Sequence, residues 1–136
     1  MSLNQTPELF WLAAVSVLTG LLWVPYILQL ILQLGPIAAL WDPVAAHPHN
    51  AAWALRAKRA HSNAVENLVV LAPLALLVSI FALGNALTAM AMAIYFGARV
   101  VHYVAFLFAI PLVRTLAFLV GFGCQAILAL TLFGLI

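Results

Sequence analysis

The sequence predicts an all-α integral membrane protein built as one four-helix bundle. Hydrophobic residues make up 68% of the 136 positions and charged residues only 6%, against about 45–50% and 25% in soluble proteins. The apolar residues gather in four segments, each long enough for the ~20 residues that cross ~30 Å of hydrocarbon. Because lipid offers the backbone no hydrogen bonds, these segments are expected to be helices.

Proline marks the ends and the irregular points of these helices. The four helices are expected at about residues 7–34, 51–83, 86–108 and 112–135, in a single domain. Pro7 suits the first turn of the first helix, and Pro111 begins the last. Pro25 and Pro73 fall inside the first and second helices and predict kinks there, because proline cannot donate a backbone hydrogen bond. A long loop, Gly35 to Asn50, joins these two helices, and tight turns join the others.

The distribution of basic residues predicts the orientation in the membrane. Three of the five Lys and Arg residues flank the long loop, and Arg114 lies on the same side. This side is expected to face the cytoplasm, with both termini outside, and the short loops favour a bacterial inner membrane. Glu8 precedes the first apolar run where a secretory signal has basic residues, so this segment is expected to be a retained helix. The basic residues form no solvated patch that favours nucleic acid.

Helix two carries a polar stripe into the membrane. At about 100° per residue, four of its side chains fall within roughly 80° of one another: Arg56, Arg59, Asn63 and Glu66. A charge at the middle of a membrane helix costs roughly 2.5–3.5 kcal/mol, so such groups mainly face a bundle interior or a wet cavity. Arginines at helix ends can also be interfacial anchors, which is the expected role of Lys58. Glu66 can also pair with an arginine as a structural contact.

Helices three and four offer further polar groups at the same level. Arg99 and His102 lie one turn apart on helix three, and Arg114 and Thr115 open helix four. Together with the stripe they predict a cationic pocket with one carboxylate and one amide. Arginine forks bind carboxylates at two points, and an arginine beside a thiol favours the nucleophilic thiolate. The pocket would therefore suit a water-soluble ligand with carboxylates, an amine and peptide groups.

These motifs resemble the MAPEG family, the membrane-associated proteins in eicosanoid and glutathione metabolism. The segment from Arg59 to Glu66, RAHSNAVE, looks like the family's signature on its second helix. Arg99-Val100-Val101-His102 and Arg114-Thr115 match its polar patches on helices three and four. The resemblance extends over most of the chain, including its length, its helix count and its loop placement.

The resemblance implies a homotrimer that binds glutathione as co-substrate between neighbouring subunits on the cytoplasmic side. By position, the glutathione contacts would be Arg56, Arg59, Asn63, Glu66, Arg99 and His102. Arg114 would stabilise the thiolate, and Thr115 stands where some members have a serine implicated in catalysis. The second substrate would be a lipophilic electrophile or hydroperoxide that arrives from the bilayer. The implied activity is that of a glutathione transferase or peroxidase.

Several positions depart from the family pattern. Ser62 replaces a common second arginine, and Asn67, Phe106 and Phe118 stand where tyrosines are frequent. Each missing hydroxyl removes a ligand hydrogen bond worth about 0.5–1.5 kcal/mol. The alternative is therefore a non-catalytic membrane protein of the same fold that binds a lipid headgroup or another anion. A channel or transporter is disfavoured, because the polar residues occupy only one half of the membrane.

A metal site is not predicted. His47 and His49 form a two-histidine motif in the long loop, but no further ligands accompany them.

Overall fold

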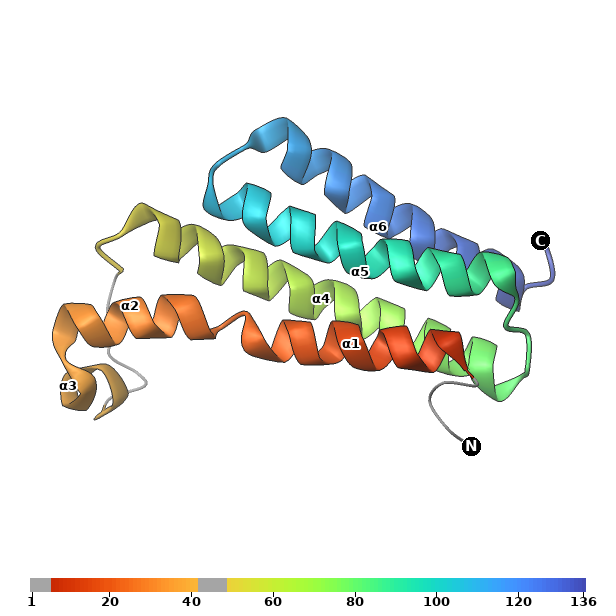
Figure 1. Cartoon of the computed structure of the whole chain (residues 1–136), viewed down its shortest axis with the longest axis horizontal. Helices are drawn as coiled ribbons and strands as arrows, with labels where there is room; N and C mark the ends of the chain where they lie inside the picture. The colour runs from red at the N-terminus through yellow and green to blue at the C-terminus, as the bar shows by residue number, and fades with distance from the viewer. Residues whose placement is uncertain (1–5, 42–48) are drawn as a thin grey trace.

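The computed structural model describes residues 6–41 and 49–136, and every regular element among them is an α-helix. The helices are α1 (Pro7–Leu21), α2 (Val24–Leu34), α3 (Pro36–Trp41), α4 (Ala52–Ile80), α5 (Ala86–Leu107) and α6 (Pro111–Leu132). Within this part of the chain, four segments are long and apolar enough to cross a membrane, with α1 and α2 together forming the first. The long helices lie side by side, each reversing the direction of the one before (Figure 1). The predicted all-α membrane bundle is confirmed.

The first span is broken near Pro25, where the sequence predicts a kink. Pro25 has no N–H to donate to the carbonyl of Leu21, and α1 ends at that residue. The break leaves backbone groups without helical partners, which is costly in lipid unless a neighbouring helix supplies one. The hydroxyl of Tyr103 on α5 donates to the carbonyl of Leu22 at 3.1 Å. By contrast, α4 continues through Pro73 without interruption.

The predicted long loop contains a further short helix. Gly35, with φ +83°, ends α2, and Pro36 begins α3 directly after it. The sequence analysis missed this helix because its prolines favour a loop, although proline also suits a first helical turn. Residues 42–48, which include His47 of the histidine motif, lie outside the described part of the chain.

Small side chains let α4 pack closely at the end that begins the helix. Four alanines spaced three or four residues apart are at most 5% exposed: Ala54, Ala57, Ala60 and Ala64. The larger core residues lie toward the other end, around Leu71, Met92 and Leu128. Small residues allow membrane helices to approach one another. The alanines thus bring α4 close to its neighbours at the level where the polar residues of α4, α5 and α6 lie.

Three helices end in the same hydrogen-bonded turn. The amides of Leu83, Ile110 and Leu135 donate to the carbonyl five residues earlier, which is the Schellman motif. The residue before each of these amides is left-handed: Ala82 (φ 53°), Ala109 (φ 56°) and Gly134 (φ 65°). Only glycine adopts this conformation at no steric cost, so two of the three turns carry strain.

Exchanging alanine and glycine at these turns should change stability in opposite directions. Ala109→Gly removes about 1–2 kcal/mol of left-handed strain and adds about 0.5–1 kcal/mol of unfolded-state entropy, so we expect a net gain of about 0.5–1 kcal/mol. Gly134→Ala is the matched reverse and should lower stability. Thermal unfolding of the detergent-solubilised protein measures both. Equal shifts of the same sign would contradict the strain assignment.

Candidate functional site

The residues that form the site on α5 and α6 lie in two matching stripes. Each stripe has the spacing i, i+4, i+7, i+11, which keeps its members on one helix face. On α5 they are Tyr95, Arg99, His102 and Phe106, and on α6 Arg114, Phe118, Gly121 and Gln125. Because α5 and α6 are antiparallel neighbours (Figure 1), the start of one stripe meets the end of the other.

The Arg99 guanidinium is the centre of the site. Its side chain is only 3% exposed. The guanidinium carbon lies 5.1 Å from the centre of the Tyr95 ring and 5.9 Å from that of Phe118, within range of cation–π attraction. It also lies against Gly121, where an added Cβ would come within 2.5 Å of Nη2. Glycine on α6 therefore makes the space that the guanidinium occupies.

Arg99 has little hydrogen bonding for a buried cation. Nη1 donates to Oδ1 of Asn63 at 3.3 Å, while Nε and Nη2 are buried without a hydrogen-bond partner. Among the described residues, no carboxylate forms an ion pair with it. Removing an ion from water costs several kcal/mol even after relaxation, and a desolvated cation–π contact returns only part of that, on the order of 2 kcal/mol. The Arg99 guanidinium therefore lacks an anionic partner that would offset its desolvation.

Amides of α4 and α6 orient Asn63 toward Arg99. Nδ2 of Asn67 donates to the backbone carbonyl of Asn63 at 2.8 Å and to its Oδ1 at 3.3 Å. Nε2 of Gln125 on α6 donates to the carbonyl of Asn67 at 3.0 Å. These bonds link α4 and α6 through neutral groups. Asn67, which departs from the family pattern, thus belongs to the network that holds Asn63.

Two phenylalanines join the remaining polar groups. The ring of His102, which is 4% exposed, lies 5.4 Å from that of Phe106 and 6.4 Å from that of Phe118. The half-buried Arg114 places its guanidinium 4.7 Å from the centre of the Phe106 ring. Arg99, His102 and Arg114 therefore form one cluster. The Phe106 ring contacts His102 and Arg114, and the Phe118 ring contacts His102 and Arg99.

The predicted stripe on α4 is only partly turned toward this cluster. Asn63 contacts Arg99, and Nε of Arg56 donates to the carbonyl of Leu107 at the end of α5 at 2.9 Å. Arg59 and Glu66 are exposed, and they form no ion pair with any described residue. The buried face of α4 is formed by its alanines. Arg56, Asn63 and Asn67 are half-buried at the edge of that face. Arg59 and Glu66 lie on the flank of that face.

Thr115 lies apart from the cluster. Its side chain is exposed, and its hydroxyl donates to the carbonyl of Pro111 one turn earlier at 3.0 Å. The hydroxyl proton is therefore occupied within α6. A catalytic use of this hydroxyl requires a side-chain rotation.

A second polar network lies between α2 and α4. The hydroxyl of Tyr26 is 2.8 Å from Nδ1 of His61, and Nδ1 of His49 is 2.7 Å from Oε1 of Gln29. Partial burial, and then the positive charge of Lys58, lowers the pKa of His49 below its usual range. A neutral His49 can donate Nδ1–H to the Gln29 carbonyl. This network fixes α2 and does not touch Arg99.

Three residues of the two stripes were not predicted as part of the site: Tyr95, Gly121 and Gln125. Tyr95 stands four residues before Arg99, and Gly121 and Gln125 continue the spacing that starts at Arg114. That shared spacing on two adjacent helices was the available signal. Gly121 and Gly123 favour close helix packing in the sequence, but the sequence does not show that an arginine side chain fills the space at Gly121.

The fold and this cluster define an integral membrane four-helix bundle with a buried cationic interior at one end. The family model described as MAPEG family matches residues 9–134, nearly the whole chain, and the chain belongs to that family. The family includes glutathione transferases and peroxidases and also non-catalytic members. Comparisons with curated proteins and with solved structures gave no match.

Filling the space at Gly121 should damage the site specifically. Gly121→Ala forces the Arg99 guanidinium to move, because the new Cβ would lie 2.5 Å from Nη2, and overpacking costs about 1–3 kcal/mol. Gly123→Ala is the matched control, since no atom lies within 4 Å of its added Cβ. We expect thermal unfolding to show a loss for the first variant and none for the second. Equal effects would contradict the close packing of Arg99.

Proposed function

We propose that this protein is a membrane-embedded glutathione transferase or peroxidase. The observation that carries the proposal is the Arg99 guanidinium, which is 3% exposed and lacks a carboxylate partner among the described residues. An ion left unpaired at this depth is expensive, so its retention favours an anionic ligand. Glutathione supplies two carboxylates, and a guanidinium fork can bind a carboxylate at two points.

Arg114 is the proposed thiolate-stabilising residue. It lies in the first turn of α6, held over the Phe106 ring. A guanidinium close to the glutathione sulfur lowers the pKa of the thiol and raises the fraction of nucleophilic thiolate. In the transferase reaction, the thiol first releases its proton to solvent, and the thiolate sulfur then forms a bond to the electrophilic carbon of a lipophilic substrate while the leaving group departs from that carbon with its bonding electron pair. Arg99, Asn63 and His102 would hold the tripeptide during this step.

Arg59 and Glu66 suggest that a neighbouring subunit completes the site. Both lie exposed on the flank of the α4 face that meets the bundle, without ion-pair partners among the described residues. MAPEG members are generally trimers. In a homotrimer of this chain, an outward-facing arginine and carboxylate would bind the part of glutathione that lies between subunits. Arg56, tied to the end of α5, would border the same cleft.

The four apolar spans and the family match both support an integral membrane location. Four spans with largely apolar surfaces require a bilayer. We propose that the cluster faces the cytoplasm of a bacterial inner membrane, following the Lys and Arg bias, with both termini outside.

A non-catalytic anion binder is the second candidate. Phe106 and Phe118 replace hydroxyls that would donate to the ligand, and the Thr115 hydroxyl is bonded to the carbonyl of Pro111. These features favour a cleft that holds an anion, such as a lipid phosphate, without activating a thiol.

Glutathione binding and thiolate formation separate the two candidates. We expect calorimetry to show binding to the wild type, and ultraviolet difference spectra to show a thiolate band that Arg114→Ala abolishes. Losing a hydrogen bond to a charged group costs about 1.5–3 kcal/mol, so Arg99→Ala should weaken binding about 10- to 100-fold.

Lys58→Ala provides the matched control, because Lys58 is an exposed basic residue of α4 outside the cluster. Its binding and its thiolate band should equal those of the wild type. Binding without a thiolate band would favour the anion binder. The absence of any binding at saturating glutathione would overturn the proposed function.

A further inference from the structure

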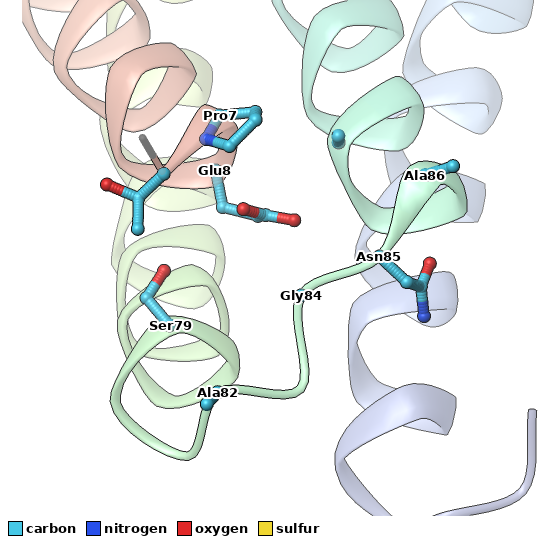
Figure 2. A pocket seen from close by; sticks show the side chains of 9 residues that line it. Pro7, Glu8, Ser79, Ala82, Gly84, Asn85 and Ala86 are labelled. Carbon is cyan, nitrogen blue, oxygen red and sulfur yellow. The ribbon is translucent and has the colours of Figure 1, made fainter. Parts of the chain in front are cut away.

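An open pocket of about 430 Å³ lies at the end of the bundle opposite the arginine cluster. It is formed where α1 begins, α4 ends and α5 begins, at the end of the bundle where α6 ends (Figure 1). Its polar lining comes from Thr6, Glu8, Ser79 and Asn85. Figure 2 shows Glu8 reaching from α1 toward the turn at Gly84, with the Asn85 side chain directed away from Glu8.

The Glu8 carboxylate is held firmly in this pocket. The side chain is 4% exposed, and its Oε1 accepts a 2.6 Å hydrogen bond from the hydroxyl of Thr88. The same hydroxyl accepts from the amide of Asn85 at 2.8 Å and lies 2.9 Å from the carbonyl of Asn85, so its single proton has two acceptors, that carbonyl and Glu8. Gly84 packs so closely that an added Cβ would lie 2.9 Å from Oε1. The second oxygen, Oε2, has no hydrogen-bond partner among the described residues.

The charges around the pocket leave it negative. The first turns of α1 and α5 contribute roughly half a positive charge each, and the end of α4 roughly half a negative charge. The Glu8 carboxylate lies among these three helix ends. Adding its full negative charge leaves about half a negative charge in excess. Within the described ranges, no basic side chain forms an ion pair with Glu8.

The pocket also offers hydroxyl oxygens as acceptors. The Thr6 hydroxyl is buried without a hydrogen-bond partner, and buried polar atoms usually have one. The Ser79 hydroxyl donates its proton to the carbonyl of Ala75 at 3.0 Å, so only its lone pairs remain available. A carboxylate with hydroxyl acceptors matches a cation that carries several N–H donors. A single carboxylate is a poor set of ligands for Ca²⁺ or Mg²⁺, which take about six or more oxygens.

We propose that this pocket binds a protonated primary amine, with Glu8 as its anionic ligand. The ammonium group donates to Oε2 of Glu8 and to the hydroxyls of Thr6 and Ser79. Because the pocket lies at an end of the membrane-spanning helices, the amine comes either from a lipid headgroup such as that of phosphatidylethanolamine or from a free solute. This inference does not depend on the proposed function.

Two binding measurements on the full-length, detergent-purified protein test this inference. Ethanolammonium chloride should raise the melting temperature more than sodium chloride does at equal ionic strength. In native mass spectrometry, the protein should retain phosphatidylethanolamine in preference to phosphatidylcholine, whose quaternary ammonium has no N–H. A shift with ethanolammonium alone identifies a free amine as the ligand, whereas lipid selectivity identifies the headgroup.

Three variants assign the effect to the carboxylate. Glu8→Gln removes the charge but keeps an acceptor for Thr88, and it should weaken amine binding about 10- to 100-fold. Gly84→Ala keeps the charge but displaces the carboxylate, so it should also weaken binding. It tests the role of Glu8 independently if Glu8→Gln does not fold. Lys58→Ala, at an exposed position of α4 outside this pocket, is the control and should retain amine binding. Equal amine binding by the wild type and Glu8→Gln, or none by the wild type, would overturn the proposal.

Discussion

The buried guanidinium of Arg99 is the constraint on which the arrangement of three helices depends. A cation at this depth must be surrounded by groups that offset its desolvation, because neither hydrocarbon nor a dry protein interior replaces the water that solvates the charge. The Tyr95 ring, the Phe118 ring and the Asn63 amide oxygen each supply part of that stabilisation. They come from α5, α6 and α4, so the position of one side chain fixes how these helices face one another.

The packing around Arg99 follows from the space that it needs. Gly121 removes a side chain where the guanidinium meets α6, and Ala60 is a small residue on the face of α4 that meets the bundle. The amide network from Gln125 through Asn67 joins α6 to α4 without adding a charge. The neutral partners hold the guanidinium in position and leave its Nε and Nη2 without a hydrogen-bond partner. A structural ion pair would have used those donors.

Composition and periodicity predict the membrane spans well, because each span must be apolar and long. The break at Pro25 is equally predictable, since the missing N–H acts within its own helix. The site is predicted less completely. Arg99 and His102 follow from helical spacing, but which flank of α4 meets α5 depends on side-chain packing. Arg59 and Glu66 therefore emerged as exposed. The left-handed Ala82 was also unpredictable, because alanine carries no turn signal.

The most direct test of this account is the stability of an Arg99→Met variant without ligand. If the role of Arg99 is to bind an anion, its guanidinium is an unpaired buried charge when no ligand is present. Methionine, an apolar side chain of similar length, removes that charge. Such replacements are often stabilising by about 1–4 kcal/mol, so the account predicts a higher melting temperature for the ligand-free variant, together with loss of glutathione binding. A lower melting temperature would contradict the account, because it would mean that the contacts of Arg99 inside the bundle already offset its desolvation without an anion.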